Sequence, residues 1–221
     1  MMQKELNILI IDDHHSIIEG YKNVLSKNKD YKLHILKANS CDQTVKAINK
    51  AKKSKPFDVV FLDIQLPASR DGELTSGEDL AQLINKEFPK TKIIISTMFD
   101  SPHRLSNILK TVPHNGILIK SDSTSKIILK AFEAVLKGNQ FYSKTAQKIK
   151  DKIIDNDELL DDYHKKIIYH LSKGVKTKNL VDHIPLSLSA IEKRKNYIKQ
   201  LFNVTGDDEQ LLIVAKKRGF I

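Results

Sequence analysis

Five short apolar runs alternate with amphipathic helical patterns over residues 6–137, and this alternation restricts the fold more than any other feature of the sequence. The runs cover residues 6–11, 33–38, 59–64, 92–97 and 116–119. Three of them consist almost entirely of Ile, Val, Leu and Phe, as expected for strands buried on both faces. The helical patterns cover residues 16–26, 41–52, 78–88, 102–109 and 125–137. We therefore predict an α/β domain with a five-stranded, doubly wound parallel sheet and helices on both of its faces.

Polar side chains stand at the carboxyl ends of four of these strands. They are Asp12 and Asp13 after the first strand, Asp63 near the end of the third, Thr97 at the end of the fourth and Lys120 after the fifth. Because functional groups of parallel sheets gather at the carboxyl edge, we expect the five side chains to converge. Carboxylates held close together repel one another, and Mg²⁺ relieves the repulsion through oxygen ligands. An aspartate can also attack phosphorus to form an acyl phosphate, whose oxygens a hydroxyl and an ammonium group can bind.

The same segments resemble the receiver domain of bacterial two-component response regulators. The matching stretches are ILIIDDHHSIIEG (8–20), VVFLDIQLP (59–67), IIISTMFD (93–100) and GILIK (116–120). The resemblance implies a flavodoxin-like fold in which Asp63 accepts a phosphoryl group from a sensor histidine kinase. It implies that Thr97 and Lys120 bind the phosphoryl oxygens. It also implies a Mg²⁺ site formed by the carboxylates of Asp12, Asp13 and Asp63 and the backbone carbonyl of Gln65.

Several positions depart from that family pattern. The loop of residues 68–76 is longer than usual, and we expect it to be exposed and available to a partner. Ile117 replaces the aromatic residue often found three positions before the lysine, and Met98 is larger than the usual residue after Thr97. An alternative therefore stays open, in which the chain has an atypical receiver and binds DNA without phosphorylation control. A Mg²⁺-dependent phosphohydrolase is disfavoured because such enzymes usually have a second acid where this chain has Gln65.

Two adjacent histidines, His14 and His15, follow the first acidic pair. Neighbouring side chains of a helix point in different directions, so we do not expect both to bind one ion. We expect them in the loop near the acidic residues. The sequence Asp-Asp-His at residues 12–14 matches a subfamily of receivers that is fused to LuxR-type DNA-binding domains.

The pattern changes after Gly138. Residues 139–157 are polar, charged and partly helical, and we interpret them as a linker that follows a receiver domain of residues 1–138. Residues 158–221 contain no strand pattern and form a small all-α domain with four helical stretches, 158–172, 176–183, 187–203 and 207–218. Ser187 and Asp207 occupy predicted N-cap positions, and Gly174 follows the first stretch as a C′ residue should.

A short helix, a break and a longer basic helix are predicted within residues 177–202, an arrangement typical of a helix-turn-helix. Residues 174–203 contain Lys176, Lys178, Lys193, Arg194, Lys195 and Lys199 but only Asp182 and Glu192 as acids. Basic side chains neutralise phosphates, and Asn and Lys can hydrogen-bond base edges. The predicted DNA-binding residues are Ser189, Glu192, Lys193, Arg194, Asn196 and Lys199. On charge alone, a solvated basic helix in a plain bundle is an equal alternative.

The segment resembles the LuxR/NarL-type helix-turn-helix. The match rests on Lys173-Gly174, Leu180-Val181, Ser187, Ile191, Ile198 and Leu201, with Leu180, Val181 and Ile184 predicted as the apolar face of the first helix. The resemblance implies double-stranded DNA as a partner and a homodimer that binds two half-sites when active. It implies a phosphorylation-controlled transcription regulator, not an enzyme.

Composition agrees with such a protein. The 37 Lys and Arg residues exceed the 27 Asp and Glu residues, giving a net charge of +10 that suits a polyanionic partner. No apolar run approaches the roughly 18–20 residues that span a bilayer, so we expect no membrane partner. Cys41 is the only cysteine. We expect it to be a small buried residue in a reducing, cytoplasmic environment.

Overall fold

The computed structural model describes residues 3–100 and 102–221, and side chains throughout them except at residues 102–103 and 152–159. The described residues divide into an α/β unit, residues 3–100 and 107–147, and a helical unit, residues 148–221 together with residues 102–106. The break lies inside the predicted linker. Within the described residues, no helix has the length and apolar composition needed to cross a bilayer.

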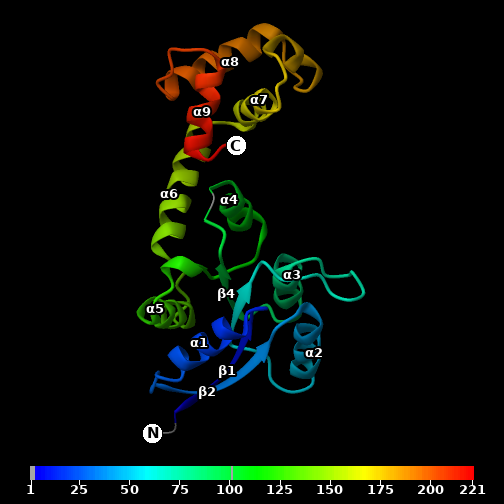
Figure 1. Cartoon of the computed structure of the whole chain (residues 1–221), viewed down its shortest axis with the longest axis vertical. Coiled ribbons are helices and arrows are strands. Elements are labelled where there is room, and N and C mark those ends of the chain that lie inside the picture. Colours follow the sequence, from blue (N-terminus) through cyan, green and yellow to red (C-terminus); the bar gives the residue numbers. More distant parts are fainter. Residues whose placement is uncertain (1–2, 101) are drawn as a thin grey trace. The chain divides into compact units, whose positions relative to one another are not determined.

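A single parallel sheet forms the centre of the α/β unit (Figure 1). Its strand order is β2-β1-β3-β4-β5-β6. The strands are β1 (Lys4–Ile11), β2 (Tyr31–Ala38), β3 (Val59–Asp63), β4 (Lys92–Thr97), β5 (Gly116–Ile119) and β6 (Phe141–Tyr142). The sequence prediction of five strands was wrong by one, because β6 lies in the predicted linker and is only two residues long. Such a segment is too short to show the alternation or apolar run that identifies a strand.

Helices cover both faces of the sheet, as the alternation predicts. They are α1 (His15–Leu25), α2 (Cys41–Lys52), α3 (Gly77–Glu87), α4 (Pro102–Thr111) and α5 (Ser125–Leu136). Helices α1 and α5 pack together on one face over a buried cluster that includes Ile8, Ile10, Phe61 and Leu118, while α2 and α3 pack together on the other face (Figure 1). Cys41 is buried at the start of α2, as predicted, and burial raises the pKa of its thiol.

The connection from β3 to α3 is fixed by a close approach of two backbones. A Cβ atom added to Gly77 would lie only 2.0 Å from the carbonyl oxygen of Asp63, so only glycine fits where α3 begins. The long loop of residues 68–76 is itself hydrogen-bonded, since Ser69 N–H donates to the carbonyl of Leu74 and Ser69 Oγ contacts Asp71. The loop therefore has internal hydrogen bonds of its own, while Gly77 holds the start of α3 against the carboxyl end of β3.

The helical unit contains most of α6 (Lys144–Leu159), α7 (Asp162–Ser172), the 3₁₀ helix η2 (Thr177–Asp182), α8 (Leu188–Leu201) and α9 (Asp208–Arg218). Its core includes Ile167, Leu180, Ile191, Ile198 and Leu211. The predicted caps are confirmed: the side chains of Ser187 and Asp207 accept backbone N–H groups of their helices, and Gly174 has φ +80° just after α7.

Two details of this unit differ from the sequence prediction. The helix expected over residues 176–183 is the 3₁₀ helix η2, and the helix expected from residue 158 begins at Asp162, because residues 158 and 159 belong to α6. Val181 is 40% exposed and does not share the buried face of Leu180 and Ile184. In a 3₁₀ helix successive side chains are about 120° apart, which turns Val181 away from its neighbour Leu180.

Candidate functional site

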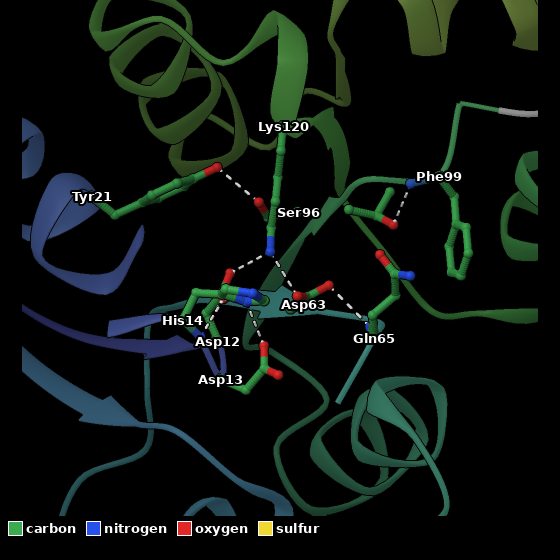
Figure 2. Close-up of polar contacts among 10 residues, drawn as sticks. Asp12, Asp13, His14, Tyr21, Asp63, Gln65, Ser96, Phe99 and Lys120 are labelled. Carbon is green, nitrogen blue, oxygen red and sulfur yellow. Dashed lines mark hydrogen bonds and ion pairs between the residues drawn. The ribbon is translucent and has the colours of Figure 1, made fainter. Parts of the chain in front are cut away.

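Lys120 and two carboxylates form a buried ion-pair cluster at the carboxyl edge of the sheet. Lys120 Nζ lies 2.7 Å from Asp12 Oδ2 and 2.6 Å from Asp63 Oδ2 (Figure 2). All three side chains are at least nine-tenths buried. Burial alone would lower the pKa of Lys120, but hydrogen bonds and charge from the two carboxylates outweigh burial and raise it above its usual value. The ammonium group therefore stays charged where a phosphoryl oxygen could contact it.

The acidic residues predicted to bind a metal also converge. Ligand atoms of Asp12, Asp13, Asp63 and His14 all lie within 4.8 Å of one another. Within the described residues, the buried Asp12 Oδ2 has no partner besides the Lys120 ammonium. Several carboxylate oxygens in so small a space suit a hard divalent cation such as Mg²⁺. The structure thus brings together the carboxylates that the sequence pattern selected and adds the His14 imidazole to them.

Gln65 lies beside this cluster in the loop after β3, and Thr97 lies beside it at the end of β4, where the next loop begins. Gln65 N–H donates to Asp63 Oδ1 at 3.0 Å, which orients the carboxylate (Figure 2). The buried Thr97 hydroxyl accepts a hydrogen bond from Phe99 N–H at 3.1 Å at the end of β4. Met98 is 59% exposed on the same loop.

A pair of hydroxyl groups next to the cluster was not predicted from the sequence. The Tyr21 hydroxyl on α1 lies 2.8 Å from Ser96 Oγ on β4 (Figure 2). The Tyr21 ring packs edge-on against Phe61 with centroids 5.2 Å apart. Burial raises the pKa of Tyr21. The only sequence signals were a serine within an apolar strand and a tyrosine on an apolar helix face. Neither signal shows that the two residues are in contact.

Asp122 connects the segment that follows β5 to the start of α6 through hydrogen bonds. This role was not predicted from the sequence. Residues Lys120–Asp122 form one 3₁₀ turn, η1. The Asp122 carboxylate accepts hydrogen bonds from Thr145 N–H (2.6 Å) and the Thr145 hydroxyl (3.0 Å). Burial would raise the pKa of Asp122, but these hydrogen bonds, together with Ser143 and Lys144, lower it. One turn of backbone therefore carries both the buried lysine and an anchor for α6.

The helical unit presents a second candidate site on α8. Ser189, Glu192, Lys193 and Asn196 are exposed and line one shallow hollow together with Tyr197 and Gln200. We call these six residues the α8 face. Sequence reasoning did not select Tyr197 or Gln200, although their spacing from Lys193 and Asn196 places them on the same side of the helix.

The structure does not bring the other two predicted DNA-binding residues to the α8 face. Arg194 Nη1 lies 2.5 Å from the carboxylate of Asp161, the N-cap of α7. Lys199 Nζ lies 3.0 Å from Asp208 Oδ1 and donates to the carbonyl of Gly206. Their charges are paired inside the helical unit.

A parallel α/β sheet with buried carboxylates and a lysine at its carboxyl edge, followed by a helical unit, defines a receiver-type signalling protein. Residues 8–133 match the family model of the response regulator receiver domain. Because the match covers more than half of the chain, the chain belongs to the response regulator family.

Relatives and solved structures match over almost the whole chain. The oxygen regulatory proteins NreC of Staphylococcus epidermidis and Staphylococcus aureus are 25% identical, over 96% of this chain and 98% of theirs. RcsB of Salmonella enterica serovar Typhimurium, bound to a promoter with the phosphomimetic BeF₃⁻, is 22% identical with a TM-score of 0.59 over 96% of this chain and 98% of that one. A further RcsB–DNA complex has a TM-score of 0.62 at 22% identity and the same coverage. These structures confirm the class of fold that the sequence predicts.

Proposed function

We propose that the chain is a cytoplasmic, phosphorylation-controlled transcription regulator that accepts a phosphoryl group on Asp63 and binds double-stranded DNA through α8. The observation that carries the proposal is the buried contact of Asp63 with Lys120, within reach of the carboxylates of Asp12 and Asp13. Membership of the response regulator family supplies the class of phosphoryl donor, a sensor histidine kinase.

In the transfer step, a carboxylate oxygen of Asp63 attacks the phosphorus of a kinase phosphohistidine. A P–O bond forms, the P–N bond breaks, and the histidine nitrogen leaves with the electron pair of that bond. Lys120, already held at Asp63, neutralises charge on the phosphoryl oxygens, and the Thr97 hydroxyl donates to one of them. Asp12, Asp13, Asp63 and the Gln65 carbonyl would hold Mg²⁺, which supplies positive charge against the phosphoryl group and the carboxylates when bound.

DNA binding rests on α8 and on the relatives. RcsB is described in complex with promoter DNA and as dimers on DNA, and its likeness extends through this helical unit. On the α8 face, Lys193 and Asn196 are exposed donors for phosphates or base edges, and Glu192 can accept from cytosine. We infer that Arg194 and Lys199 support the helix instead of contacting bases. A homodimer would place two copies of α8 on two half-sites.

The test is acyl-phosphate formation by the full chain. Incubation with phosphoramidate and Mg²⁺ should shift the wild type on a phosphate-affinity gel and leave Asp63→Ala unshifted. The phosphorylated form should then bind DNA with higher affinity or in a different stoichiometry. No shift in either protein would favour the atypical receiver, whose DNA binding is independent of phosphorylation. Turnover of generic phosphate esters would instead favour the phosphohydrolase.

A further inference from the structure

The imidazole of His14 belongs to the same group of ligand atoms as the three aspartates. His14 Nδ1 lies 2.7 Å from Asp13 Oδ1 and 3.3 Å from Asp12 Oδ1 (Figure 2). Its backbone N–H also donates to Asp12 Oδ1 at 3.0 Å, which ties this residue to the buried carboxylate. A ring nitrogen of His14 lies within 4.8 Å of the carboxylate oxygens, Asp63 included. The imidazole therefore belongs to the same cluster of candidate ligand atoms as the three carboxylates.

An added nitrogen changes which cation such a site favours. Mg²⁺ takes oxygen ligands and keeps several waters, so an imidazole adds little to its binding. First-row transition ions accept imidazole readily, and their affinity for nitrogen-containing sites rises along the series from Mn²⁺ to Cu²⁺. A site made of carboxylates alone lacks this second kind of ligand.

We propose that His14 is a nitrogen ligand of the metal site formed by Asp12, Asp13 and Asp63, and that it shifts this site toward divalent transition ions relative to Mg²⁺. The inference rests on the proposed metal site and adds one ligand to it. To ligate an ion, Nδ1 would give up the proton that it shares with Asp13 Oδ1 and offer its lone pair, and the ring proton would reside on Nε2. Because the His14 side chain is 67% exposed, water can accept the Nε2 hydrogen bond.

His15 provides a matched control in the adjacent position. It is exposed at the first residue of α1 and is not part of the group of ligand atoms found among the described residues. The pKa of Glu19, one turn further along α1, is lowered mainly by the hydrogen bond from Lys37, and His15 is only a minor contributor. Replacing His15 removes an imidazole of the same kind, one residue away, without removing the proposed ligand.

The experiment combines nitrogen spectroscopy with metal affinity on the full chain. Pulsed electron paramagnetic resonance of the Mn²⁺-loaded protein should show ¹⁴N modulation in the wild type and in His15→Ala, and none in His14→Ala. Calorimetric titration should show that His14→Ala loses roughly tenfold in Co²⁺ affinity, while its Mg²⁺ affinity changes by less than about twofold. Circular dichroism checks that each variant is folded.

Absence of nitrogen modulation in the wild type, or an unchanged ratio of Co²⁺ to Mg²⁺ affinity in His14→Ala, overturns the proposal. His14 would then be only a hydrogen-bond partner of Asp13. If no divalent ion binds the wild type, the proposed metal site fails together with this inference. The acyl-phosphate gel, repeated with and without Mg²⁺, tells that outcome apart from loss of nitrogen ligation alone.

Discussion

The α/β unit and the helical unit both contain an ion pair between a cation and a carboxylate, in different surroundings. At the edge of the sheet, Lys120 is held between Asp12 and Asp63, and all three side chains are at least nine-tenths buried. In the helical unit, Arg194 is paired with Asp161, but their side chains are 29% and 49% exposed. Water screens the second pair and hardly reaches the first. A fixed cation therefore contributes strongly to the stability of the buried cluster, whereas an exposed cation mainly sets the local geometry.

Lys120→Met should have the largest effect. It leaves Asp12 and Asp63 buried with no cation, and we expect the free energy of unfolding of the α/β unit to fall by about 3 kcal/mol in metal-free buffer. Mg²⁺ should restore part of the loss. Urea denaturation followed by circular dichroism measures the change. Lys126→Met, at an exposed position on α5, is the matched control and should change stability by less than about 0.5 kcal/mol. An equal loss of stability in the two variants would contradict the expected difference between a buried and an exposed cation.

Substitutions on the α8 face should weaken DNA binding without lowering the stability of the helical unit. Lys193→Ala and Asn196→Ala should each weaken specific DNA binding by roughly 1–3 kcal/mol where they contact bases, without loss of stability. Fluorescence anisotropy with DNA selected from a random pool measures this, and wild-type affinity should fall steeply with salt.

Arg194→Ala provides the opposite case within the same helix. It should lower the stability of the helical unit by up to about 1 kcal/mol, since its ion pair with Asp161 is largely exposed, and leave base preference unchanged. A changed base preference at full stability would place Arg194 on the DNA-contacting side after all.

The sequence revealed the acidic cluster because each member stands at the end of an apolar run, and a parallel topology brings such ends together. The caps Ser187 and Asp207 were predictable for a similar reason, since their signals are local. The structure confirms the convergence of the carboxylates and both caps.

The missed contacts share a different property. Tyr21 and Ser96 are 75 residues apart, Asp122 and Thr145 are 23 apart, and Arg194 and Asp161 are 33 apart. No periodicity links such partners, because each contact depends on how helices pack in space. For Arg194, the helix is predictable from the sequence but the ion pair with Asp161 is not, so the charge pattern alone selected it as a DNA-binding residue.

The Tyr21–Ser96 pair tests whether a buried neutral contact matters as much as a buried ion pair. Tyr21→Phe should cost about 1 kcal/mol of stability, because it removes one hydrogen bond and leaves the buried Ser96 hydroxyl without it. Combined with Ser96→Ala, the two changes should be less than additive in a double-mutant cycle. Strict additivity in urea denaturation would show that the two hydroxyls do not interact.

The smallest of the predicted effects is a loss of stability of the helical unit at acidic pH. Burial would raise the pKa of Asp208, but hydrogen bonds and charge from Lys195 and Lys199, each 3.0 Å away, lower it. Because the folded-state pKa is below the unfolded one, the contribution of Asp208 is fully present above the unfolded pKa and disappears as pH falls through the folded value. The Asp208 side chain is 35% exposed, so screening keeps this contribution small.

Asp208→Asn removes the titrating group with little change in size. Thermal unfolding of the wild type and of this variant, compared from pH 6 down to pH 2, should show the wild type more stable at pH 6. The difference should narrow as the carboxylate is protonated. A constant difference across this range would mean that the ionisation of Asp208 does not contribute to the stability of the helical unit, and that its exposed ion pairs differ in this respect from the buried pairs of Asp12 and Asp63 with Lys120.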